Sequence, residues 1–283
     1  MTKYDIGLVE SDLAWLQILG QERVNYRLWT PESGEPGPRV IVLNRPLTEG
    51  EVEKFRSYVE AGAGVLTDFP NLALLVPGFK CTEVEVIRYI EPEPVPVFNG
   101  LGLIDLELPG YCSNQANFGH LDNQGAALCA RALGQGYVIA LPFDVAAALR
   151  DRRHGLKTFY HPGTELPYED VAVVSHGAIR RLCANALREL CRQIHMPYVH
   201  VWYYPDFKRS AFIFRVDGDF ARKDDFVRAL ELAQRHALKF TWFINAKAQQ
   251  SFLSYFAELA KQGHDVQLHC FEHRVAKTEA EKL

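Results

Sequence analysis

The sequence predicts an α/β protein in two parts: a doubly wound parallel sheet over residues 1–204 and the first part of an irregular β/α barrel over residues 205–283. Three observations support this prediction. Short apolar runs alternate with amphipathic stretches of helical length, capping residues and glycines fall at the ends of those stretches, and a segment around Pro205 interrupts the alternation. One large α/β domain is the alternative for a chain of 283 residues.

The first part begins as a succession of strands and helices. Apolar runs predict strands at residues 5–9, 24–28, 39–43, 65–67 and 137–141. A helical stripe covers residues 13–19, and Thr48 with Glu51 forms a capping box that opens a helix through residue 58. Ser175 can cap a further helix that ends near Pro197. This succession predicts a parallel sheet covered by helices on both faces. In residues 70–130 the sequence shows only a strand-like stretch at 83–90, so the arrangement of that segment is not predicted.

A second series of strands and helices starts after residue 205. It consists of strands at 211–216, 239–244 and 265–268 and helices at 224–237 and 246–262, with Gly263 closing the second helix. Three strands with two helices make roughly a third of a β/α barrel. The sequence therefore predicts an incomplete domain in this part of the chain.

Composition and charge exclude several classes of protein. Apolar residues make up 48% and charged residues 23% of the chain, which is typical of a folded globular protein. The longest apolar runs are far below the roughly 20 residues that cross a bilayer. A net charge of -4 argues against nucleic acid as a partner. The 6 cysteines form no Cys-x-x-Cys pair and no signal peptide is visible, so we expect reduced thiols and a cytoplasmic protein.

Four polar residues follow strands of the second series. Asp217 and Asp219 end its first strand, and His269 and His273 follow its third. Loops after the strands of a β/α barrel share one rim, so these side chains should converge. The i, i+4 spacing lets both imidazoles bind one divalent ion, one carboxylate supplies a third ligand, and the other can take a proton from metal-bound water. A chance His-x-x-x-His or an Asp-x-Asp turn explains either pair alone, whereas their conjunction predicts a metal site.

These motifs resemble a known family. Residues 214–219 (Phe-Arg-Val-Asp-Gly-Asp), the strand 241–244 (Thr-Trp-Phe-Ile) and residues 263–273 look like the first two signature motifs of NodB-type polysaccharide deacetylases, carbohydrate esterase family 4. The resemblance covers about residues 205–283. It implies that Asp217 is the catalytic base and that Asp219, His269 and His273 bind one divalent ion, most often Zn²⁺.

The sequence departs from this family pattern in three ways. Gly218 splits the family's commoner Asp-Asp pair, and Cys270 stands where Ser or Thr usually follows the first His, which weakens a hydrogen bond that orients the ligands. The later motifs of the family would fall beyond Leu283. The chain is therefore expected to be a fragment or a truncated product that lacks part of the active site.

The first part resembles, more loosely, the flavodoxin-like fold of class I glutamine amidotransferases. Residues 40–44, the helix over 48–58 and the stretch 62–66 (Gly-Ala-Gly-Val-Leu) carry this likeness. Cys112 is the candidate for the nucleophile that such an enzyme needs, but it follows Pro109 and has no suitably spaced His partner. We therefore expect residues 1–204 to be non-catalytic.

Two functions follow from these expectations. The first is a metal-dependent hydrolase that removes an N-acyl group from an amino sugar of a surface polysaccharide or of its lipid-linked precursor. The alternative is a non-catalytic ligand-binding or docking protein that carries a degenerate deacetylase domain, which the missing barrel strands favour. The sugar, the metal in the cell and the oligomeric state do not follow from the sequence.

Overall fold

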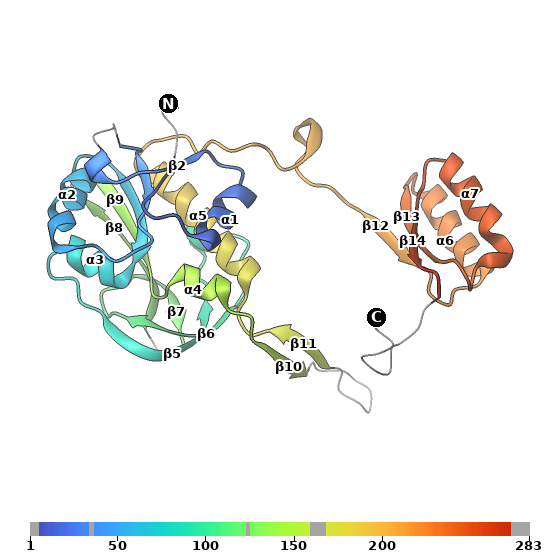
Figure 1. The fold of residues 1–283 in the computed structure, drawn as a ribbon, viewed down its shortest axis with the longest axis horizontal. Helices are drawn as coiled ribbons and strands as arrows, with labels where there is room; N and C mark the ends of the chain where they lie inside the picture. The colour runs from blue at the N-terminus through green and yellow to red at the C-terminus, as the bar shows by residue number, and fades with distance from the viewer. Residues whose placement is uncertain (1–5, 34–36, 123–124, 159–167, 273–283) are drawn as a thin grey trace. The chain divides into compact units, whose positions relative to one another are not determined.

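The computed structural model describes residues 6–33, 37–122, 125–158 and 168–272 of the chain (Figure 1). The chain divides into two compact units, Met1–Trp202 and Tyr203–Leu283. This division lies beside residue 205, where the sequence places the boundary. Among the described residues, no helix is both long and apolar enough to cross a membrane.

One nine-stranded sheet forms the centre of the first unit, in the order β2-β1-β3-β4-β9-β8-β7-β5-β6. Its strands are β1 (Ile6–Leu8), β2 (Tyr26–Leu28), β3 (Val40–Val42), β4 (Gly64–Asp68), β5 (Thr82–Glu91), β6 (Ile104–Cys112), β7 (Phe118–Leu121), β8 (Ala126–Leu133) and β9 (Gly136–Leu141). The neighbours from β2 to β9 are parallel, whereas those from β9 to β6 are antiparallel. The unit is therefore a mixed α/β structure on one large sheet.

The antiparallel half corrects the prediction of a fully parallel sheet, and the flavodoxin-like architecture is not confirmed. β8 and β9 are joined by a tight turn in which Gly134 has a φ of 60°, a conformation that favours glycine. Parallel neighbours need a long crossover, usually a helix, and the described residues from β5 to β8 contain no α-helix. These strands can therefore pair only with reversed direction.

Helices cover both faces of this sheet. The helices α1 (Leu13–Gln21), α4 (Val145–Arg150) and α5 (His176–Gln193) pack on one face, and α2 (Glu49–Glu60) and α3 (Phe69–Leu75) on the other (Figure 1). In β3, Val40 and Val42 enter the first core, whereas Ile41 and, just after the strand, Leu43 enter the second. A strand buried on both faces needs apolar residues at every position, which explains the continuous apolar runs of the sequence.

The predicted helix caps have different outcomes. The capping box of Thr48 and Glu51 is present at the start of α2. Ser175 is the N-cap residue of α5, but its side chain makes no capping hydrogen bond and instead donates to Asp105 Oδ2 at 3.4 Å. The remaining elements of this unit are the 3-10 turns η1 (Pro31–Ser33) and η2 (Pro96–Phe98) and an antiparallel pair, β10 (His154–Thr158) and β11 (Tyr168–Ala172).

The second unit contains a three-stranded parallel sheet in the order β12-β13-β14. Its elements are η3 (Pro205–Phe207), β12 (Phe214–Asp217), α6 (Lys223–Arg235), β13 (Phe240–Asn245), η4 (Gln250–Phe252), α7 (Leu253–Lys261) and β14 (Asp265–Cys270). Both helices pack on one face of the sheet, around the buried rings of Phe226, Trp242 and Phe256 (Figure 1). Residues of β12 alternate between half-buried and exposed, so Arg215 and Asp217 point to the opposite face.

Candidate metal centre

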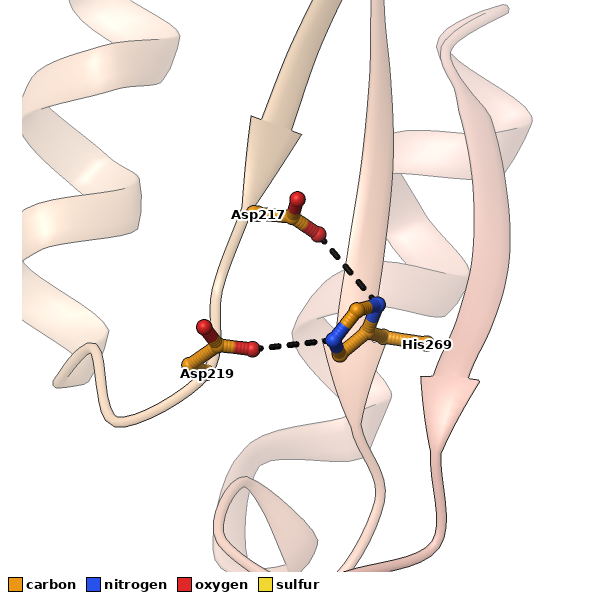
Figure 2. Close-up of side chains that lie close together, drawn as sticks. All are labelled: Asp217, Asp219 and His269. Atoms are coloured by element: carbon orange, nitrogen blue, oxygen red, sulfur yellow. Dashed lines mark ion pairs between the residues drawn. The ribbon is translucent and has the colours of Figure 1, made fainter. Parts of the chain in front are cut away.

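The predicted site residues come together at one edge of the second unit. Asp217 is the last residue of β12, Asp219 lies two residues further along the turn, and His269 is in β14. Because the two strands run parallel with β13 between them, their carboxyl ends lie at the same edge. Figure 2 shows the imidazole of His269 between the two carboxylates.

The three side chains are within contact distance of one another. His269 Nδ1 lies 3.4 Å from Asp217 Oδ1, and His269 Nε2 lies 3.1 Å from Asp219 Oδ1. One ligand atom from each residue lies within 4.8 Å of the other two. The side chains are 41%, 39% and 27% exposed for Asp217, Asp219 and His269, so the cluster is open to an ion and to a substrate.

The donor set fits a divalent ion. Carboxylate oxygen and imidazole nitrogen both bind Zn²⁺ at about 2.0 to 2.2 Å, which places two ligands of one tetrahedral ion about 3.4 Å apart. The measured separation of 3.1 Å between His269 and Asp219 is close to this value. Small side-chain movements would therefore convert the cluster into a coordination sphere.

Two further residues that the sequence predicts at the site are His273 and Cys270. His273 lies outside the described residues. Cys270 ends β14 and is a half-buried free thiol, and its backbone carbonyl accepts a hydrogen bond from Ala246 N at 3.0 Å. This bond ties the strand that carries His269 to the chain that leaves β13. The predicted effect of the Cys270 thiol on ligand orientation stays a prediction.

Arg215 holds Asp217 in place, and the sequence interpretation did not identify it as a site residue. Its guanidinium donates to Asp217 Oδ2 at 2.6 Å and lies 4.4 Å from the centre of the Phe243 ring. One Asp217 oxygen is thereby bound, and the other faces His269. The signal was present in the sequence, because residues i and i+2 of a strand share a face.

A buried glutamine forms hydrogen bonds with the backbone of the turn between the two carboxylates. Gln249 is fully buried, and its Nε2 donates to the carbonyl oxygen of Gly218 at 2.8 Å and to that of Asp219 at 3.4 Å. Its Oε1 accepts from Asn245 N at 2.6 Å. These contacts join the turn between Asp217 and Asp219 to the end of β13. The sequence predicts a helix from residue 246, whereas α7 begins at Leu253, directly after η4.

The other candidate residues of the sequence do not form a second site. Cys112 is the last residue of β6, which leads to another strand and not to a helix, so it does not occupy a strand-to-helix elbow. His120 Nε2 lies 3.1 Å from Glu93 Oε1, an exposed contact on β7. Within the described ranges, the group of Asp217, Asp219 and His269 is the one that has metal-ligand spacing.

Comparisons with known proteins give a limited answer. No protein-family model matches the chain, and no curated protein matches it. Similar solved structures include a β-galactosidase from Rahnella sp. R3 (9% identity, 69% of this chain and 32% of that chain, TM-score 0.46). An α-L-fucosidase isoenzyme 2 from Paenibacillus thiaminolyticus matches with 14% identity over 66% of this chain and 33% of that chain, at a TM-score of 0.44.

These comparisons correct the two family resemblances. The similar structures named here are glycoside hydrolases, and none of these is a NodB-type deacetylase or a glutamine amidotransferase. The family assignments made from the sequence motifs are therefore wrong. The chain spans about a third of the length of the glycoside hydrolases, for example 32% of a β-galactosidase from Bacillus circulans sp. alkalophilus. At TM-scores below 0.5 the likeness assigns neither an activity nor a substrate to this chain.

Proposed function

We propose that residues 203–283 carry a divalent-metal site of a hydrolase, with Asp219 and His269 as ligands, His273 as a further ligand, and Zn²⁺ as the metal. One observation supports this most directly: two carboxylates and an imidazole from separate strands converge within 4.8 Å. A bound ion would polarise a substrate carbonyl and lower the pKa of its bound water. The proposal rests on the site and not on any family.

Asp217 is the proposed general base. The Arg215 guanidinium donates to its Oδ2 at 2.6 Å, which fixes the orientation of the carboxylate. The second oxygen, Oδ1, remains directed at the cluster, 3.4 Å from His269 Nδ1. A water molecule between Asp219 and His269 would therefore lie within hydrogen-bond reach of this oxygen.

The proposed reaction is removal of an N-acyl group from an amino sugar of a surface polysaccharide or of its lipid-linked precursor. Water attacks the amide carbonyl while Asp217 takes its proton, and the tetrahedral intermediate collapses to a carboxylate and a free amine as Asp217 returns that proton to the leaving nitrogen. Two exposed rings next to the site suit a sugar: Phe220 is 74% and Phe271 70% exposed. Aromatic faces of this kind pack against the C–H face of a sugar ring.

The geometry is less suited to cleavage of a glycosidic bond. Glycosidases place two carboxyl groups on either side of that bond, about 5 to 9.5 Å apart, with free space between them. Here the imidazole of His269 faces both carboxylates and contacts each of them, at 3.4 Å for Asp217 and 3.1 Å for Asp219 (Figure 2). The arrangement therefore favours a single metal-bound water over a pair of catalytic carboxylates.

A non-catalytic role is the second candidate, and one observation favours it. His269 Nδ1 lies 3.4 Å from Asp217 Oδ1 and its Nε2 lies 3.1 Å from Asp219 Oδ1, so the three side chains can contact one another without an ion between them. In that case the three residues would join β12 to β14 and bind no ion. The protein would then be a non-catalytic ligand-binding or docking protein.

The test is amine release from N-acetylglucosamine oligomers by the 283-residue chain loaded with Zn²⁺. We expect turnover in the wild type and in Asp265→Asn, a matched control at the opposite end of β14, and loss of turnover in Asp217→Asn. Metal binding without turnover in all three proteins would refute the hydrolase and keep the metal site. Failure to bind Zn²⁺ at all would support the non-catalytic alternative.

A further inference from the structure

The central strand of the second unit carries an aromatic ring that the core of this unit does not use. Residues of β13 alternate between the two faces of the sheet, and Phe240, Trp242 and Ile244 enter the core beneath the helices. Phe243 lies on the opposite face and is half-buried, and the core of the described residues does not include it. Core packing therefore does not account for an aromatic side chain at this position.

The face of this ring contacts Arg215. Phe243 pairs with Asp217 in the register of β12 and β13, and Arg215 lies two positions before Asp217 on the same face of the sheet. The guanidinium carbon of Arg215 lies over the Phe243 ring, 4.4 Å from its centre, which is within the range of a cation–π contact. The same guanidinium donates to Asp217 Oδ2 at 2.6 Å. The ring therefore limits where the guanidinium can lie, and the guanidinium orients the carboxylate.

The same ring also contacts the other side of the cluster. The rings of Phe243 and His269 form an edge-to-face pair, with their centres 6.5 Å apart and their planes at 88°. This is a geometry that aromatic pairs prefer. His269 belongs to β14, which lies on the other side of β13 from β12. The side chain of Phe243 thus contacts one residue on each of the two outer strands.

Both of these neighbours need such a contact to keep one orientation. The side chains of Arg215 and His269 are 53% and 27% exposed. Exposed side chains keep several rotamers, and ordering them costs conformational entropy. An ion pair between exposed groups contributes little to this ordering, because solvent screens it. A ring that packs against both side chains reduces their freedom before an ion or a substrate binds.

We propose that Phe243 is a positioning residue of the metal site. Its face orients Arg215 and, through it, the base Asp217, and its edge-to-face contact orients the ligand His269. This role rests on the proposed function, because it is a role at that same site. It concerns the side chain alone: the Phe243 carbonyl, which accepts from Gly218 N at 2.9 Å, is present whatever the side chain is.

The first measurement needs no metal. The ring current of an aromatic side chain shifts protons above its face upfield in the NMR spectrum, so the guanidinium protons of Arg215 should be shifted in the metal-free 283-residue chain. We expect this shift in the wild type and in Phe243→Tyr, which keeps the ring. We expect its loss in Phe243→Leu, which keeps an apolar side chain without a ring. An unshifted signal in the wild type, or the same shift in Phe243→Leu, would overturn the inference.

The second measurement compares Zn²⁺ affinity by calorimetry with amine release from N-acetylglucosamine oligomers. Phe243→Leu should bind Zn²⁺ about fivefold more weakly, because His269 loses its aromatic neighbour. It should also lower kcat about fivefold with KM nearly unchanged, because the base is displaced and the binding of substrate is not. Phe243→Tyr should restore both values. Phe207→Leu, at a position in η3 that is 87% exposed, is the matched control and should behave as the wild type does.

The outcomes separate this inference from the proposed function. Zn²⁺ binding without turnover in the wild type would refute the hydrolase, and weaker Zn²⁺ binding in Phe243→Leu alone would still support the positioning role. Wild-type affinity and kcat in Phe243→Leu would overturn the inference and leave the proposed function intact. Losses that Phe243→Tyr does not restore would also overturn it. No Zn²⁺ binding by the wild type would refute the metal site, and the role of Phe243 would fall with it.

Discussion

Gly218 separates the two carboxylates of the proposed metal site, and its lack of a side chain is the feature that can be tested most sharply. A Cβ atom at this position would lie 2.4 Å from Phe226 Cζ and 2.8 Å from Phe226 Cε1. Phe226 is 1% exposed and packs against Trp242 and Phe256, so its ring cannot move freely. Gly218→Ala therefore forces either the ring or the turn to move.

The expected cost follows from overpacking. Forcing one methyl group into a well-packed core costs about 1 to 3 kcal/mol. The turn is also held from the other side, because Gly218 N donates to Phe243 O at 2.9 Å and Gln249 binds the Gly218 carbonyl. Displacement of the turn moves Asp217 and Asp219 relative to His269. We expect Zn²⁺ affinity to fall together with the free energy of unfolding.

Chemical denaturation and competition with a zinc-binding dye would measure both quantities for Gly218→Ala. Combining it with Phe226→Leu removes the ring atoms that the new methyl group meets, so the double variant should regain Zn²⁺ affinity even though Phe226→Leu lowers stability by itself. Unchanged stability and affinity in Gly218→Ala would refute the reasoning. So would a double variant that binds Zn²⁺ no better than the single one.

Three other predictions concern buried polar groups. Gln249→Leu removes the donors to the Gly218 and Asp219 carbonyls, and we expect a Zn²⁺ affinity at least about tenfold weaker, measured with the same dye. His264 accepts a hydrogen bond from Phe240 N, and burial lowers its pKa below the usual 6.5, so the second unit should be fully stable above about pH 6.5 and lose stability below it. Urea unfolding at pH 7.5 and 5.5 checks this, and the same loss in His264→Gln would contradict it. The hydrogen bond from Arg45 is the main cause that lowers the pKa of Glu51 from 4.5 to about 2. The stability that this carboxylate contributes is therefore fully present above pH 4.5 and should be lost as the pH falls towards 2. Urea unfolding across this range should show no such acid transition in Glu51→Gln.

The parallel half of the large sheet was predictable, and the antiparallel half was not. β3 and β9 are apolar at nearly every position, because both faces of these strands are buried. Strands β5 to β8 lie among Pro and Gly residues, and the register of β5 and β6 shifts twice. Pairing direction in such a segment depends on tight turns and on neighbours distant in the sequence, which periodicity does not reveal.

At the candidate site, the sequence indicated the residues that carry chemistry but not those that position them. Asp217, Asp219 and His269 end parallel strands, so their meeting at one edge follows from strand direction alone. Gln249 escaped notice because it lies in a stretch with helical periodicity, and only its full burial shows that it holds the turn. The family resemblance was the least reliable step, since short motifs describe a local arrangement and not a whole fold.

The central claim is a divalent-metal site in which Asp219 is a ligand and Asp217 is not. Calorimetric titration of Zn²⁺ into the wild type, Asp217→Asn and Asp219→Asn tests it most directly. The structure predicts one ion per chain, an affinity nearly unchanged in Asp217→Asn, and a large loss in Asp219→Asn, because only the second substitution removes an anionic ligand. Equal losses in both variants would make Asp217 a ligand, and no binding to the wild type would contradict the claim.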